Sequence, residues 1–516
     1  MPAADTTTEK PLPETLPAAH DAILALRSEL QQARWQIEQF KRTLYGPSSE
    51  RVVDPEFSKE QVLLSLFPPP AEPPATENVV LPEGKSSDGK TNEGSKPRTP
   101  RQPAIRHIET VTERIEPADM ICAHCGKAKC EIGCEKSERF EYIPARIVRH
   151  EIIRPRLACP CGQGTVSVAP LPPAPIEKGM PGPGLLAQVL LAKYDDHIPL
   201  YRQEQQFARL GVNFPRQTLA DWGEKGAALL QILVARVKQR LMSGRYLQVD
   251  ETPVKVMDPE IKGKCATGYL WVAGVPGGDV IFEFHRGRSQ GCGAELLKDF
   301  NNGYLQRDGY GAYGAIARGR PGLIAVGCGA HLRRKFVDAL EDEPVQAKWF
   351  VDEWRKLYLI ERHARDEGMD ATQRLALRQE KSQPIVDAMK RRLDELALSS
   401  LLPESPLGKA VRYARNEWAA WTTSLKAGQL KIDSILAEND LRPTCLGRRN
   451  YLFIGHPEAG WRSAVIYSLI ASCRRRGIDP WEYLRDVLTR LPSMTNQEID
   501  SLLPENWKPA VKEPAV

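Results

Sequence analysis

Two short apolar runs of strand-forming residues each carry an acidic side chain, and this feature most restricts the folds open to the chain. The run at 246–254 places Asp250 among leucine and valine, and the run at 303–311 places Asp308 directly before a glycine. A buried carboxylate without a partner costs several kcal/mol, so each acid needs a hydrogen-bond donor, a basic group or a cation. Two acids carried on strands favour a metal site, although either acid alone would equally fit a salt-bridged or turn aspartate.

The order of elements after residue 245 predicts how these acids would meet. Alternating apolar patterns predict strands at 245–257, 268–275, 280–285, 303–308 and 323–327. Helices are expected at 292–301, at 310–318 and from residue 331, and residues 345–427 fit a helical insertion. This is the element order of a ribonuclease-H-like α/β domain. In that fold the first acid lies on the first strand and the second at the end of the fourth, where Asp250 and Asp308 fall.

Composition sets broader limits. A chain of 516 residues predicts several domains, since single cores seldom exceed roughly 300 residues. Hydrophobic residues make up 41%, yet the longest apolar stretches are too short to span a bilayer, and the proline-rich start is not a signal segment. We therefore expect a cytoplasmic protein. The net charge of +5 does not by itself indicate a nucleic-acid partner, and eleven unevenly spaced cysteines fit metal binding in a reducing compartment.

The N-terminal part carries a heptad pattern. Apolar residues at alternating steps of three and four form a seam from residue 23 to residue 44: Ile23, Leu26, Leu30, Ala33, Ile37, Phe40 and Leu44. A seam of this length fits either a homodimeric coiled coil or an amphipathic helix docked on its own chain. The stretch at 67–104 is rich in proline, glycine, serine and charged residues, which predicts a flexible linker.

Paired cysteines then predict a zinc ribbon. Cys122 and Cys125 form one knuckle, and Cys159 and Cys161 form a tighter one, with strands expected at 140–143 and 147–153. The short spacing of the second pair leaves the fourth ligand open, with Cys130, Cys134 and His124 as substitutes. The alternative is a set of buried free thiols.

A helix-turn-helix pattern follows the zinc ribbon. A helix at 185–194 and another at 200–211 lead through a short turn into a polar helix start at 216–222. This spacing places Arg216 and Gln217 at the head of a recognition helix. The same spacing also occurs in helical proteins that never touch DNA.

Ordered motifs along nearly the whole chain show a family resemblance. The chain resembles the transposases of the insertion-sequence 66 family, which carry a catalytic Asp-Asp-Glu triad. The matching stretches are Leu44-Tyr45-Gly46, Ser49-Glu50-Arg51, the cysteine knuckles, Lys193-Tyr194, Pro199-Leu200-Tyr201-Arg202, Asp250-Glu251-Thr252, Asp308-Gly309-Tyr310, Ala330-His331, Arg333-Arg334-Lys335-Phe336, Gly477-Ile478-Asp479-Pro480 and Tyr483-Leu484.

The resemblance implies a site. The family's acids fall on Asp250, Asp308 and Glu438, which would hold Mg²⁺ or Mn²⁺. The family's usual run around the glutamate is Asp-Asn-Asn-x-x-Glu-Arg. In this sequence Ser434, Ile435 and Asn439 replace the two amides and the arginine, and Asp433 and Asp440 are alternative third acids.

The resemblance also implies partners and an activity. These would be double-stranded DNA as terminal inverted repeats and target, a second copy of the chain, and possible accessory proteins of the same element, all at the bacterial nucleoid. Phosphate contacts are expected from His331, Arg333, Arg442, Arg448 and Arg449. The expected activity is strand cleavage and transfer. The alternative is an inactive copy that acts as a sequence-specific DNA-binding protein.

The predicted architecture is therefore multidomain. Its expected parts are an N-terminal coiled-coil segment (1–66), a linker (67–104), a zinc ribbon (105–175), a helix-turn-helix region (176–244), a ribonuclease-H-like catalytic domain (245–475, with the insertion at 345–427) and a C-terminal helical segment (476–516).

Overall fold

The computed structural model describes residues 124, 127, 145–157, 166–261 and 263–509. The predicted coiled coil, the linker and the four proposed zinc cysteines lie outside these residues. Residues 147–509 fall within one compact unit. Within the described ranges, no helix combines the length and the apolar character needed to cross a membrane.

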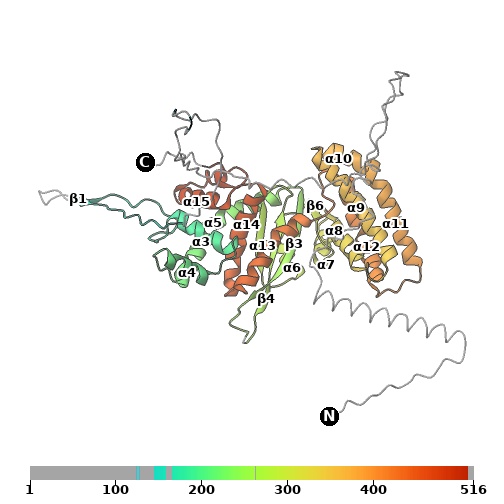
Figure 1. Cartoon of the computed structure of the whole chain (residues 1–516), viewed down its shortest axis with the longest axis horizontal. Helices are drawn as coiled ribbons and strands as arrows, with labels where there is room; N and C mark the ends of the chain where they lie inside the picture. The colour runs from blue at the N-terminus through green and yellow to red at the C-terminus, as the bar shows by residue number, and fades with distance from the viewer. Residues whose placement is uncertain (1–123, 125–126, 128–144, 158–165, 262, 510–516) are drawn as a thin grey trace, which may run out of the picture. The chain divides into compact units, whose positions relative to one another are not determined.

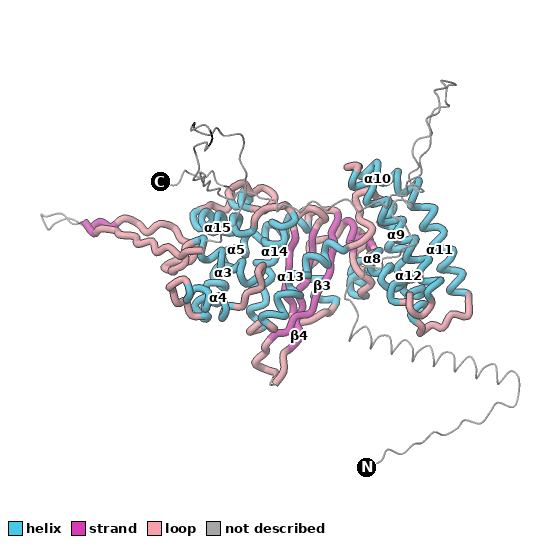
Figure 2. Tube along the Cα trace, in the orientation of Figure 1, coloured by secondary structure: helices cyan, strands magenta, loops and turns pink. Residues whose placement is uncertain are grey.

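A five-stranded mixed sheet forms the centre of this unit (Figure 2). Its order is β5-β4-β3-β6-β7, with β3, β4 and β5 antiparallel and β3, β6 and β7 parallel. The strands are β3 (Tyr246–Val256), β4 (Ala266–Gly274), β5 (Val280–His285), β6 (Gly303–Gln306) and β7 (Leu323–Val326). All five strands predicted for this region are confirmed, each within a few residues of its predicted ends.

Helices cover both faces of the sheet. Successive side chains of β3 point to opposite faces and so contact different helices. Glu251 points to α7 (Gly311–Arg318), where it accepts a hydrogen bond from the Tyr313 hydroxyl. Gln248 and Thr252 point to the opposite face and contact the segment that contains α13 (Ile435–Tyr451). Asp250 lies between them and therefore faces the same way.

Helix α14 (Gly460–Arg475) closes one edge of the sheet. Its Ser468 and Ser472 hydroxyls accept hydrogen bonds from the main-chain N–H groups of Phe282 and Val280 on the edge strand β5. Capping these groups removes an open strand edge that would otherwise pair with another chain.

The helices before the sheet agree with the predicted ones. They are α3 (Pro183–Tyr194), α4 (Leu200–Arg209) and α5 (Arg216–Met242). Edge-to-face packing of Phe207, Phe214 and Trp222 fixes the turn between α4 and α5. After α14 the chain continues through α15 (Pro480–Arg490), which packs on α3. Short 3-10 helices lie at Thr423–Lys426, Pro457–Ala459, Leu491–Ser493 and Ile499–Leu502.

Between β7 and α13 the chain forms a helical insertion with a core of its own, whose helices are drawn in orange tones at the right of Figure 1. Helix α8 (Gly329–Asp338) leads into it. It comprises α9 (Pro344–Asp366), α10 (Ala371–Leu377), a π-helical turn (Arg378–Ser382), α11 (Gln383–Leu398) and α12 (Pro406–Thr422). Phe336 stacks on Phe350, and Trp354 packs against Trp421 in its interior.

Two predicted elements differ from the structure. Residues 147–153, expected as a strand, pair with no other strand of the described region. The local ladder instead joins β1 (Arg156–Leu157) to β2 (Ser167–Val168), because a strand needs a partner as well as apolar residues. The helix expected at 292–301 is α6 (Gln290–Leu296), which ends early as Leu297 and Phe300 turn into the core.

Candidate active site

Two neighbouring parallel strands bring Asp250 and Asp308 close enough for their charges to interact. Gln248 on β3 pairs with Gln306, the last residue of β6; Asp250 lies two residues further along β3, and Asp308 lies two residues beyond the end of β6. Main-chain N–H groups hold one oxygen of each acid. The N–H of Glu251 donates to Asp250 Oδ1 at 2.8 Å, and that of Tyr310 donates to Asp308 Oδ1 at 2.9 Å.

The surroundings of Asp250 oppose its negative charge. Burial is the main cause that raises its pKa to about 7, and the charges of Asp308 and Glu251 raise it further. The N–H of Glu251 and the side chain of His331 act in the opposite direction. An ionised Asp250 beside an ionised Asp308 therefore needs a compensating positive charge.

Helix α13 passes across β3 at the level of Asp250. Gln248 Nε2 donates to the Asp433 carbonyl at 2.9 Å just before the helix, and Thr252 Oγ1 lies 3.5 Å from Cys445 Sγ further along it. Asp250 is between these two anchors, so it faces the first half of α13. Glu438 lies in the first turn of that helix.

The third proposed acid has a basic partner in this structure. Arg334 Nη2 of α8 lies 3.2 Å from Glu438 Oε1, and both side chains are about two-fifths exposed. The same helix carries His331, whose charge acts on Asp250. Helix α8 thus faces two of the three proposed acids.

The carboxylates of Asp250 and Asp308 fit a hard divalent cation. Oδ2 of Asp250 and of Asp308 has no hydrogen-bond donor among the described residues, and carboxylate oxygens are the ligands that Mg²⁺ and Mn²⁺ prefer. His331 Nδ1 is also buried there without a partner in the described region. No group of three or more His, Cys, Asp or Glu side chains meets in a metal-binding arrangement within the ranges described.

The two alternative third acids have other contacts. Asp440 forms a two-point ion pair with Arg475 of α14. Asp433 is half-buried, and burial raises its pKa, while the main-chain N–H of Ile435 donates to its carboxylate. Both acids therefore stabilise the packing of α13 and the segment before it.

A second polar cluster braces Asp308 from the opposite face of β3, and sequence reasoning did not find it. Glu251 has a side chain 1% exposed, accepts from Tyr313, and pairs with Arg288 at 2.6 Å. The Arg288 guanidinium lies 4.0 Å from the centre of the Tyr310 ring, and Tyr310 holds Asp308 through its N–H. The signal available was the acidic pair at 250 and 251, whose members must face opposite sides of one strand.

The predicted DNA contacts fall into two groups. Arg216, Arg442 and Arg449 are exposed, and Arg442 donates to Asn439 within α13. Arg448 instead donates to the Pro253 carbonyl and lies 3.4 Å from Thr252 Oγ1, so it fastens α13 to β3.

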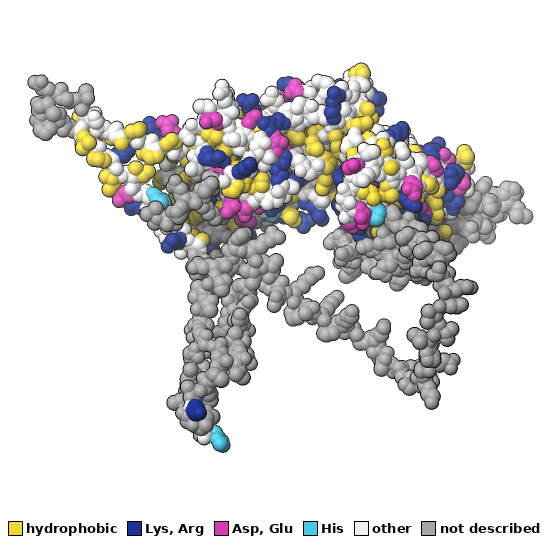
Figure 3. Space-filling view, turned by 90° about the horizontal axis from the view of Figure 1, so that it is seen from above, with side chains coloured by type: hydrophobic (Ala, Val, Ile, Leu, Met, Phe, Trp, Pro, Cys, Tyr) yellow, Lys and Arg dark blue, Asp and Glu magenta, His cyan; other side chains and the backbone are white. Residues whose placement is uncertain are grey.

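The remaining DNA candidates lie on α5 and α8. Gln217 donates to Asp221 along the exposed start of α5, and Arg333 is half-buried on α8 near His331. Basic and acidic side chains are interspersed over the face shown in Figure 3, so a DNA contact on this face would come from local groups.

Comparison with known proteins identifies the family. The profile described as Transposase IS66 family matches residues 178–462, which is more than half of the chain. The chain belongs to the IS66 transposase family. The IS66 C-terminal element matches residues 468–504, and the zinc-finger binding domain of transposase IS66 matches residues 119–162. That last match supports a structural zinc and DNA binding in this IS66 protein.

Relatives from Sinorhizobium fredii (strain NBRC 101917 / NGR234) match along most of the chain. "Uncharacterized protein y4jD" is 32% identical over 517 residues, which covers 96% of this chain and 97% of the relative. "Uncharacterized protein y4qI" is 34% identical over 436 residues, covering 81% of this chain and 79% of the relative. The likeness thus extends well beyond the zinc-finger region.

Proposed function

We propose that this IS66 protein is a DNA transposase that cleaves and joins DNA strands with Asp250, Asp308 and Glu438. The observation that carries the proposal is the proximity of Asp250, in the middle of β3, to Asp308, just after β6, with α13 crossing the same face. The strand order with β3 at its centre, two antiparallel strands on one side and two parallel strands on the other, supports a ribonuclease-H-like domain.

The acids would hold divalent ions against the scissile phosphate. Such ions would supply an activated water or 3′ hydroxyl and would stabilise the departing oxygen. Asp250, Asp308 and Glu438 would hold them. The main-chain N–H groups on Oδ1 of Asp250 and of Asp308 orient the free oxygens toward that place.

Glu438 would exchange partners to complete the site. In the structure it forms an ion pair with Arg334. On binding DNA and metal, Arg334 would turn to a phosphate and leave the glutamate to the ion. His331, at the start of α8, would contact the same phosphate, since its Nδ1 is buried without a partner in the described region.

Recognition of the DNA ends would come from the N-terminal half. The zinc ribbon, with Cys122, Cys125, Cys159 and Cys161 as ligands, and the head of α5, with Arg216 and Gln217, would bind the terminal inverted repeats. Exposed Arg442 and Arg449 would add phosphate contacts whose strength falls as salt rises. Pairing of two ends would need a homo-oligomer, with accessory proteins of the element as further candidates.

The test is strand transfer of labelled terminal-repeat DNA with Mg²⁺. Wild-type protein should cleave and join the DNA, whereas Asp250→Asn and Asp308→Asn should bind it normally and do neither. Matching activity in wild type and both variants would refute the proposed acids.

A second candidate is an inactive copy that binds DNA ends without cutting them. The sequence differences at Ser434, Ile435 and Asn439 around Glu438 favour it, as does the pairing of that glutamate with Arg334. Terminal-repeat binding without strand transfer by the wild type, also in a lysate that supplies the element's other proteins, would select this reading.

A further inference from the structure

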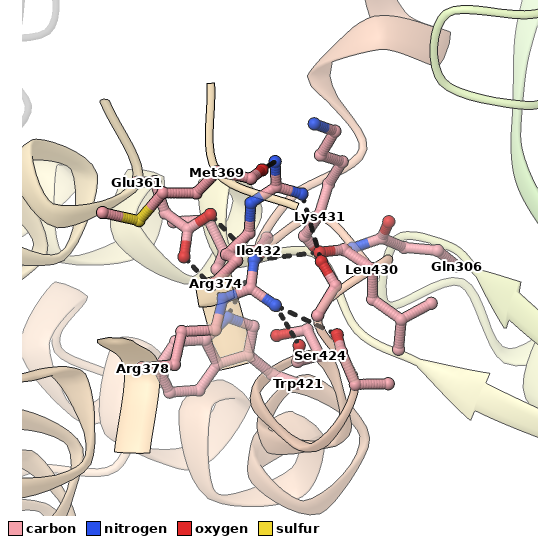
Figure 4. Close-up of polar contacts among 12 residues, drawn as sticks. Gln306, Glu361, Met369, Arg374, Arg378, Trp421, Ser424, Leu430, Lys431 and Ile432 are labelled. Atoms are coloured by element: carbon pink, nitrogen blue, oxygen red, sulfur yellow. Dashed lines mark hydrogen bonds and ion pairs between the residues drawn. The ribbon is translucent and has the colours of Figure 1, made fainter. Parts of the chain in front are cut away.

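Side chains from other parts of the protein hold the main chain that connects the helical insertion to α13. We call residues 424–434 the return segment, because it leads from α12 back to the helix that carries Glu438. Figure 4 shows how donors converge on its carbonyl groups from the insertion and from the sheet.

Arg378 is the centre of this network. Its side chain is 1% exposed, and it belongs to the π-helical turn between α10 and α11. Nε and Nη2 donate to the two carboxylate oxygens of Glu361 at 2.6 and 2.7 Å. The same guanidinium donates to three carbonyls of the return segment, those of Ser424 (2.8 Å), Ala427 (3.1 Å) and Leu430 (2.9 Å). All five N–H donors of a guanidinium are thereby used.

Further donors hold the rest of the segment. Arg374 donates to the Gly428 carbonyl at 3.1 Å, and a side chain at Gly428 would collide with the Ala371 carbonyl, so the chain passes there at close range. From the sheet, Gln306 Nε2 donates to the Lys431 carbonyl at 2.8 Å.

The next two carbonyls are held in the same way. The Gly329 N–H donates to the Ile432 carbonyl at 2.9 Å, and Gln248 donates to the Asp433 carbonyl at 2.9 Å. Helix α13 starts two residues after Asp433. The position of Glu438 against Asp250 therefore depends on these donors.

The insertion also reaches the segment that carries Asp308. Arg307 Nη1 donates to the Asp308 carbonyl at 2.7 Å and pairs with Glu417 of α12. A Cβ at Gly309 would lie 2.4 Å from the Tyr413 hydroxyl, also on α12. The insertion thus contacts the main chain beside Asp308 as well as the return segment that leads to Glu438.

We propose that the helical insertion is a positioning element of the catalytic site, in which Arg378 sets the place of Glu438. This rests on the proposed function. A buried ion pair is a poor stabiliser, because apolar residues of similar size often give equal or greater stability. We therefore attribute this buried pair to the hydrogen bonds that Arg378 donates to three carbonyls of the return segment, and not to a contribution to the free energy of folding.

The experiment maps metal ligands directly in the full-length protein. Fe²⁺ takes the place of Mg²⁺, and with ascorbate and hydrogen peroxide it generates radicals that cut the main chain beside its ligands. Wild-type protein bound to terminal-repeat DNA should be cut next to Asp250, Asp308 and Glu438. Arg378→Lys should lose the cut at Glu438 and keep the other two.

Activity and a matched control complete the test. Arg378→Lys should raise the Mg²⁺ concentration for half-maximal strand cleavage by about 10–100-fold, the usual effect of losing a group that orients a ligand. Affinity for terminal-repeat DNA should not change. Arg476→Lys, which alters a part-buried pair with Asp279 (2.7 Å) at the β4–β5 turn, should match wild type in both assays.

A double variant separates positioning from folding. Replacing Arg378 and Glu361 with methionine together leaves no unpaired buried charge, so the helices should remain folded by circular dichroism, yet the cut at Glu438 should still disappear. A wild-type cut at Glu438 in both variants would overturn the inference. Absence of all three cuts in wild type would instead contradict the proposed function.

Discussion

Replacing Asp250 with asparagine should stabilise the metal-free protein, because burial disfavours the charged form of this carboxylate. The pKa rises from an ordinary 3.8 to about 7. At about 1.4 kcal/mol per pH unit, this difference corresponds to at most about 4 kcal/mol of folding free energy. Asparagine has nearly the same shape and still accepts the hydrogen bond from the Glu251 N–H, so the charge is the main change.

The sign of the pH dependence follows from proton binding. Between pH 3.8 and 7 the unfolded chain releases the proton of Asp250 while the folded chain keeps it, so the contribution of this residue to stability falls as pH rises. Asp250→Asn should therefore be more stable than wild type by up to about 4 kcal/mol at pH 8, and by no more than about 2 kcal/mol at pH 5.

Thermal melting by circular dichroism across this pH range measures the effect. The variant should melt several degrees above wild type at pH 8, with a smaller gap at pH 5. Saturating Mn²⁺ should raise the melting temperature of wild type alone. Asp221→Asn, an exposed change on α5, is the control and should follow wild type. A variant no more stable than wild type at pH 8, or a gap independent of pH, would show that the fold does not raise the pKa of Asp250.

Three further outcomes follow. Strand cleavage at limiting Mg²⁺ should slow as pH falls below about 7, since a proton competes with the cation for Asp250; a flat rate profile from pH 5.5 to 8 would disagree. Tyr313→Phe should lower the free energy of unfolding by about 1–3 kcal/mol in urea, because Glu251 loses a buried donor; an unchanged midpoint would contradict this. Cys122→Ser should reduce the zinc content and weaken terminal-repeat binding, and zinc retained at the wild-type level would exclude this cysteine as a ligand.

Local pattern was enough to predict the sheet and its two acids. The strands are short runs rich in apolar, β-branched and aromatic residues, and Asp250 and Asp308 each follow such a run. The parallel pairing of β3 and β6 then brings the two acids together without further information.

What the sequence could not predict depends on contacts between distant segments. Nothing near Arg448 indicates that it would bind the Pro253 carbonyl of β3 instead of remaining exposed, and nothing near Arg378 indicates its burial against the return segment. The strand expected at 147–153 failed for the same reason, since strand pairing requires a partner that local residues do not specify.

Anomalous scattering from Mn²⁺ in crystals of the protein with pre-cleaved terminal-repeat DNA would show whether the three acids bind metal together. Mn²⁺ should lie between Asp250 and Asp308, within coordination distance of both, with Glu438 turned from Arg334 to the metal. Mn²⁺ bound elsewhere, or a Glu438 side chain that stays on Arg334 with the DNA and metal in place, would contradict the proposed site.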